Sequence, residues 1–189
     1  MNPLQDVSAP RPVSSSRNVY HGMVWSIRRD TVQFADGVEF DRELMDHTGA
    51  VALLALDDAG RAIVINQYRH PVGEEMWELP AGLLDHPEED PASAALRELT
   101  EETGYEADSA EPLAEFYPSP GGSDELIRVY LARGVRPAEQ NAYERVHEEA
   151  EIKVRAVPMA ELLEGVLQGR LRNGPLQIGV LTAQARGIS

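Results

Sequence analysis

Hydrophobic residues occur in short, nearly continuous runs near the middle of the chain. Residues 51–56 and 61–66 are two such runs, separated by a cluster of Asp and Gly. Asp and Gly supply the backbone geometry of a tight turn, so the two runs are predicted to pair as a hairpin. Because neither run alternates apolar and polar residues, both strands are expected to be buried on both faces of a sheet.

Further segments extend this pattern towards the C-terminus. Shorter strands are expected at 77–80, 113–117, 126–132 and 152–157. Two later segments place apolar residues at the i, i+3, i+4 spacing of amphipathic helices, at 159–168 and 175–185. Interleaved strands and helices without an internal repeat predict an α/β sandwich rather than a helical bundle.

The N-terminal part of the chain has a different composition. Residues 1–18 are rich in Pro and Ser and lack the apolar stretch of a secretory signal, so we expect a flexible tail and a cytoplasmic protein. Residues 19–48 are predicted to form a small β-element, with a turn near Arg29 and Asp30. The main domain is expected to span residues 49–189.

One predicted helix has capping residues at both of its ends. Asp90 can cap the free N–H groups, Pro91 suits the first helical position, and Gly104 provides a stop. The residues predicted to form its buried stripe are Ala92, Ala95, Leu96, Leu99 and Thr103.

Three glutamates lie outside that stripe and share one face of the same helix. Glu98, Glu101 and Glu102 fall within an arc of about 100°. Like charges at this spacing repel, so a compensating cation is expected. Hard oxygen ligands suit Mg²⁺ or Mn²⁺, whereas a solvated acidic face is the alternative that composition alone favours.

Length and charge restrict the possible functions. The 189 residues suffice for one well-buried core, and the net charge is −15. This charge opposes binding to nucleic acid or an anionic membrane, and no apolar run is long enough for a membrane span. An anionic small molecule stays possible, because a bound divalent cation can invert the charge of an acidic pocket. The chain has no cysteine, which excludes disulfides and thiolate chemistry.

The sequence around the acidic helix resembles the Nudix box. Residues 97–105 read R-E-L-T-E-E-T-G-Y, which matches the second half of that signature at every specified position. In the first half, Gly82 has the family spacing to Glu88, whereas Glu89 has the family spacing to Arg97. A one-residue insertion explains this difference, and we favour Glu89 for the first acidic position.

The resemblance implies a Nudix-type α/β/α sandwich with a mixed sheet. It implies that Glu98 and Glu102 bind the divalent metal, Mg²⁺ or Mn²⁺, and that Glu101 is a further ligand or catalytic support. Arg97 would orient these carboxylates by ion pairing, and the carbonyl of Ala81 would be another ligand.

Segments outside the box resemble the ADP-ribose pyrophosphatase branch of the family. These segments are residues 67–72, 77–82 and 119–125. This resemblance implies hydrolysis of ADP-ribose to AMP and ribose 5-phosphate, with Arg69 and Glu78 contacting the substrate. Ser123 and Asp124 would lie near the terminal ribose.

Three further points concern the substrate, the residue that acts as general base, and the oligomeric state. Another ADP-sugar or nucleoside diphosphate derivative is an alternative substrate, and a non-catalytic ADP-ribose-binding module is an alternative function. In this branch a late-loop glutamate usually serves as general base, which here is Glu148 or Glu149, and the strand alignment favours Glu148. The branch commonly forms homodimers that exchange their N-terminal strands.

Overall fold

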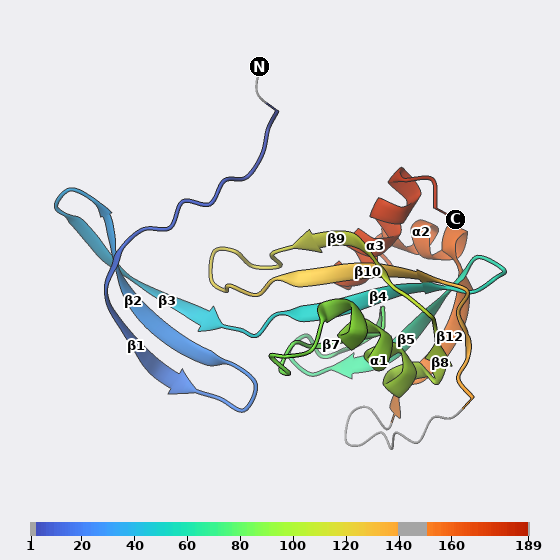
Figure 1. Cartoon of the computed structure of the whole chain (residues 1–189). Coiled ribbons are helices and arrows are strands. Elements are labelled where there is room, and N and C mark those ends of the chain that lie inside the picture. Colours follow the sequence, from blue (N-terminus) through green and yellow to red (C-terminus); the bar gives the residue numbers. More distant parts are fainter. Residues whose placement is uncertain (1–2, 140–150, 189) are drawn as a thin grey trace. The chain divides into compact units, whose positions relative to one another are not determined.

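The computed structural model describes residues 3–139 and 151–188, which form two compact units (Figure 1). The first unit comprises Met1–His47 and Ser119–Glu125, and the second comprises Thr48–Pro118 and Leu126–Ser189. Residues 119–125, predicted within the main domain, therefore group with the N-terminal strands.

The first unit contains an antiparallel sheet of three strands in the order β1-β2-β3. The strands are β1 (Val13–His21), β2 (Ser26–Ala35) and β3 (Val38–Asp46). Two sequence predictions are wrong here. Residues 13–18 belong to a strand rather than to a tail, and the predicted turn at Arg29 and Asp30 lies in the middle of β2.

Cross-strand side-chain contacts explain both corrections. The Ser16 hydroxyl donates to a carboxylate oxygen of Asp30 at 2.6 Å, and the hydroxyls of Ser15 and Thr31 lie 2.9 Å apart. These contacts pair the serine-rich segment with β2, and the Ser16 hydroxyl gives the Asp30 carboxylate a hydrogen-bond donor within the sheet. The chain turns instead after β1, where the N–H of Gly22 donates to the carbonyl of Trp25, and at Gly37, which has a positive φ of 72°.

The second unit is built on a mixed sheet with the central order β12-β5-β4-β10-β9. These strands are β4 (Ala50–Leu56), β5 (Arg61–Arg69), β9 (Glu111–Phe116), β10 (Ile127–Arg133) and β12 (Lys153–Pro158). The pairing of β4 with β10 is parallel, and the other pairings are antiparallel. The predicted hairpin of β4 and β5 is confirmed, as are the strands near 113–117, 126–132 and 152–157.

Four short strands complete the described sheets. They are β6 (Glu74–Glu78), which pairs with β5, β7 (Ala81–Leu83), which pairs with β4, and the separate pair β8 (Tyr105–Glu106) and β11 (Arg136–Pro137). Of these, the sequence indicated only β6, whose observed position is displaced towards the N-terminus from the predicted 77–80.

Helices cover both faces of the mixed sheet, as the α/β/α prediction requires. The helices are α1 (Pro91–Thr103), α2 (Met159–Leu167) and α3 (Gly174–Ala185). Leu54 of β4 belongs to a core cluster shared with α2 and α3, whereas its neighbour Leu53 belongs to a cluster shared with α1. Successive residues of β4 therefore pack on opposite faces, which explains why this strand is apolar throughout.

Both predicted ends of α1 are confirmed. The Asp90 carboxylate accepts hydrogen bonds from the N–H groups of Ala92 and Ser93, both at 3.1 Å. Gly104 ends the helix in the left-handed conformation, with a φ of 73°. The helix starts and stops where local chemistry directs it, so its glutamates are placed in a defined register.

Within residues 3–139 and 151–188, no helix is both long and apolar enough to cross a membrane.

Candidate active site

A hollow of about 500 Å³ opens in the second unit, and both halves of the predicted motif border it. Its lining comes from the end of β5, from β7, from the following loop and from α1. The lining residues are Gln67, Arg69, Ala81, Gly82, Leu83, Asp85, His86, Arg97, Glu98, Glu101 and Glu102. The hollow therefore brings together all three glutamates of the helix, both predicted arginines and Ala81.

Arg97 is the cation that compensates the acidic face of α1. Its guanidinium donates to Glu98 at 2.8 Å and to Glu101 at 3.0 Å. It also makes a two-pronged contact with Glu89, with both distances 3.1 Å. One arginine thus holds three carboxylates in place.

The charges in this cluster alter one another's proton affinity. Hydrogen bonding to Glu89, together with the charges of Glu98 and Glu101, raises the pKa of Arg97 far above its ordinary value. The same arginine holds the pKa of Glu89 below its usual range. Both groups therefore stay charged across the neutral range, and their ion pair persists there.

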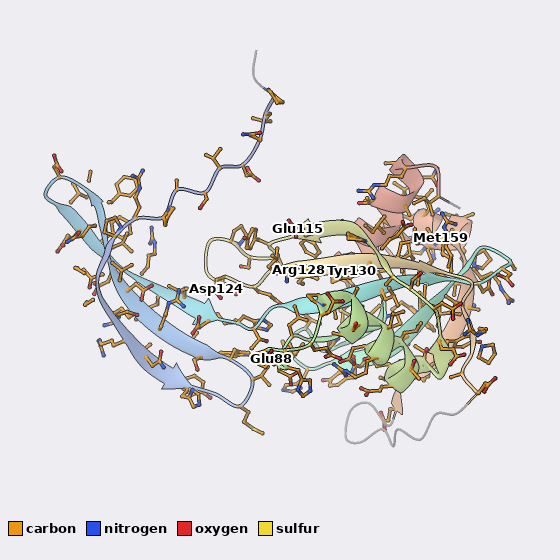
Figure 2. All side chains as sticks on the ribbon, in the orientation of Figure 1. Glu88, Glu115, Asp124, Arg128, Tyr130 and Met159 are labelled. Carbon is orange, nitrogen blue, oxygen red and sulfur yellow. The ribbon has the colours of Figure 1, made fainter. Side chains whose placement is uncertain are left out.

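The structure distinguishes Glu88 from Glu89, the two candidates for the first acidic position of the motif. Glu89 pairs with Arg97, as its spacing to that residue favoured. Glu88 lies in the loop before α1 (Figure 2), is exposed, and makes no hydrogen bond or ion pair within the described residues. Glu88 is therefore a surface residue next to the cluster.

Glu102 differs from the other two glutamates of the helix. The sequence placed it outside the buried stripe, yet only 7% of its surface is exposed. Its carboxylate accepts a hydrogen bond from the N–H of Ala81 at 2.9 Å. Because β7 packs against this part of α1, the strand covers a position that helix periodicity alone assigns to solvent.

Gly82 allows the chain to approach Glu98 very closely. A Cβ atom built on Gly82 would lie 2.0–2.6 Å from the Oε1, Cδ and Cγ atoms of Glu98. Contacts this short do not occur between real atoms, so any larger residue would displace the glutamate. The missing side chain thus makes the space in which the Glu98 carboxylate lies against β7.

The residues of the hollow suit a hard divalent cation. Carboxylate and carbonyl oxygens are the ligands that Mg²⁺ and Mn²⁺ prefer, and four carboxylates, those of the three helix glutamates and of Asp85, border one space. Across the described residues, no three His, Asp or Glu side chains are grouped closely enough to form a ready-made metal site. Arg97 and the Ala81 amide hold the carboxylates of the helix, so metal binding would have to exchange these contacts.

Arg69 and Glu78, both predicted to contact the substrate, contact each other. The guanidinium donates to the carboxylate through two bonds, of 2.9 and 2.6 Å. Glu78 is only 3% exposed, whereas the side chain of Arg69 is 43% exposed and lines the hollow. The buried acid therefore positions the arginine, and of the two side chains the arginine is the one that lines the hollow.

Ser123 and Asp124 belong to the first unit, and the described contacts that hold them lie within it. The Asp124 carboxylate accepts from the N–H of His47 at 2.9 Å and from Arg28 at 3.5 Å. The Ser123 hydroxyl accepts from the N–H of Glu125 at 3.1 Å. The other predicted site residues, Glu148 and Glu149, lie outside the described residues.

Three polar residues of the hollow were assigned no site role by the sequence analysis. Asp85 and His86 come from the loop that carries the inserted residue, and Gln67 comes from β5. A signal existed for Gln67, because it precedes Arg69 by two positions and alternate residues of a strand share a face. Nothing in the spacing indicated that the loop would border the hollow.

A mixed sheet between two helical layers, with an acidic helix beside a glycine-lined hollow, defines a class of α/β/α protein to which Nudix hydrolases belong. A family model described as NUDIX domain matches residues 45–176. The chain therefore belongs to the Nudix hydrolase family.

Known relatives agree with this membership. The chain is 43% identical to the ADP-ribose pyrophosphatase of Mycobacterium tuberculosis, over 90% of this chain and 82% of that protein. It is 35% identical to the GDP-mannose pyrophosphatase of Cronobacter sakazakii, over 80% of this chain and 81% of that protein. A crystal structure of an ADP compounds hydrolase has a TM-score of 0.77, with 96% of each chain covered and 18% identity. This structure supports the fold.

Proposed function

We propose that this Nudix hydrolase cleaves ADP-ribose to AMP and ribose 5-phosphate with the help of Mg²⁺ or Mn²⁺. The observation that carries the proposal is the convergence of Glu98, Glu101 and Glu102 on the hollow beside Gly82. The 43% identity to an ADP-ribose pyrophosphatase supports the choice of substrate.

The reaction adds one water to a diphosphate. The water oxygen bonds to one phosphorus, the bond from that phosphorus to the bridging oxygen breaks, and two phosphate monoesters result. A divalent cation in the hollow would offset the charge of the phosphate oxygens and lower the pKa of the attacking water. Glu98, Glu102 and the Ala81 carbonyl would hold it, with Glu101 as a further ligand or support.

The arginines of the hollow have separate roles in this proposal. Arg97 holds the glutamates in register through the contacts described above. Arg69, oriented by Glu78, supplies positive charge to the diphosphate, since a guanidinium matches phosphate geometry. Ser123 and Asp124 near the terminal ribose, and Glu148 or Glu149 as general base, remain predictions from the sequence.

An assay of hydrolysis by the purified protein, with a panel of nucleoside diphosphate substrates, tests this function. We expect ADP-ribose to be cleaved fastest in Mg²⁺ or Mn²⁺, with AMP and ribose 5-phosphate as the products and no cleavage in EDTA. Faster cleavage of GDP-mannose or of another ADP-sugar would retain the mechanism and replace the substrate. Tight binding of ADP-ribose without turnover would favour the non-catalytic module.

We also propose that the chain forms a homodimer through its N-terminal strands. Every residue of β1 is exposed in the single chain, and Tyr20 and Trp25 are 57% and 40% exposed. A sheet of three strands buries little apolar surface on its own, and its β1 edge offers unpaired hydrogen-bonding groups to a second chain. Sedimentation equilibrium is expected to give twice the chain mass of 20.8 kDa. A single-chain mass across the micromolar range would refute the dimer.

A further inference from the structure

Gln67 has a buried polar atom without a partner. Among the buried side-chain nitrogen and oxygen atoms of the described residues, its Oε1 is the one that lacks a hydrogen bond. The residue is 8% exposed. Burying an acceptor without a donor costs free energy, and such atoms are rare in folded proteins. A leucine of similar size would avoid this cost, so the amide needs a reason to be there.

The position of Gln67 suggests that reason. It lines the same hollow as the glutamates of α1 and shares a face of β5 with Arg69. The other polar groups of the hollow have partners: Arg97 pairs with three carboxylates, Arg69 pairs with Glu78, and Glu102 accepts from the Ala81 amide. The Gln67 oxygen is therefore an acceptor in this hollow that is available to a hydrogen-bond donor of a bound group.

The chemistry of the hollow restricts the donor that can satisfy it. An ionised diphosphate carries acceptors only, and the neighbouring carboxylates are acceptors as well. A divalent cation of the Mg²⁺ type keeps several waters when bound to protein, and each is a strong O–H donor. The terminal torsion of a Gln side chain is broad, so the amide turns its oxygen towards the hollow at low cost.

We propose that Gln67 is a positioning residue for the divalent cation, accepting a hydrogen bond from a water in the cation's hydration shell. This inference rests on the proposed metal-dependent function. A neutral amide supports the cation without adding a further negative charge to the acidic hollow. Hydrogen-bond partners of this kind, next to the direct ligands, commonly influence metal affinity by about 10- to 100-fold.

Three variants separate this role from a purely structural one. Gln67→Leu removes both the acceptor and the donor, whereas Gln67→Glu retains the acceptor and removes the donor. Asn66→Ala is the matched control, because Asn66 is similarly buried, at 7% exposure, on the other face of the same strand. Mn²⁺ affinity is measured by electron paramagnetic resonance, and stability is measured by urea unfolding in EDTA.

We expect Gln67→Leu to weaken Mn²⁺ binding by about 10-fold while its metal-free stability equals or exceeds that of the wild type. Gln67→Glu should bind Mn²⁺ at least as tightly as the wild type. Asn66→Ala should bind Mn²⁺ with the affinity of the wild type. Equal Mn²⁺ affinity of Gln67→Leu and wild type would overturn the inference. So would equal weakening in Gln67→Leu and Gln67→Glu, since the amide would then act as a donor. If the wild type itself binds no Mn²⁺, the proposed metal-dependent function fails instead.

Discussion

Replacing Glu102 by Gln is expected to reduce turnover of ADP-ribose by about 10²- to 10³-fold, the range for loss of one group that stabilises developing charge. The substitution removes the negative charge that would bind the cation but retains a side-chain oxygen. That oxygen can still accept from the Ala81 N–H, which the wild-type carboxylate does at 2.9 Å. The fold should therefore survive, and steady-state kinetics with Mg²⁺ and urea unfolding measure the two effects separately.

Glu88→Gln is the control for this prediction. It makes the same chemical change in the loop just before α1, at an exposed residue without a partner in the described part of the chain (Figure 2). Its turnover should equal that of the wild type. If Glu102→Gln hydrolysed ADP-ribose at the normal rate in Mg²⁺, Glu102 would not be a metal ligand, and its burial would reflect only its bond to β7.

The parts of the fold that the sequence predicts well depend on local chemistry. Asp90 and Gly104 determine the two ends of α1, because capping and a left-handed residue act within one helical turn. The strands β4 and β5 were predictable because their apolar runs are flanked by strong turn residues. The register of the glutamates follows from the ends of α1, whereas the α/β/α layering was implied by the family resemblance.

The parts that escaped prediction depend on contacts between segments distant in the chain. Glu102 is buried because β7 packs against α1, which the periodicity of the helix cannot reveal. The serines of β1 looked like a tail because their partners, Asp30 and Thr31, lie on a neighbouring strand. Similarly, residues 119–125 group with the N-terminal strands through bonds such as that from the His47 N–H to Asp124.

Replacing Gly82 by Ala is expected to lower kcat/KM by about 10²-fold, because misplacement of a reacting group by about 1 Å can cost that much. The new methyl group would occupy the space of the Glu98 carboxylate, at the 2.0–2.6 Å distances described above. The atoms in conflict are the far end of a flexible side chain, so Glu98 can turn away while the backbone stays in place. The free energy of unfolding should therefore change by about 1 kcal/mol or less.

A glycine with open surroundings provides the comparison for Gly82→Ala. Apart from its two chain neighbours and the nearby backbone of its own helix, no atom lies within 4 Å of a Cβ built on Gly174. This glycine is the first residue of α3 and has no positive φ. Gly174→Ala should therefore leave kcat/KM unchanged and leave stability equal or slightly higher. The contrast between the two variants isolates the displacement of Glu98 from the general effect of adding a methyl group. Wild-type kcat/KM in Gly82→Ala would mean that catalysis does not require Glu98 to lie against β7, and the proposed ligand set would lose that residue.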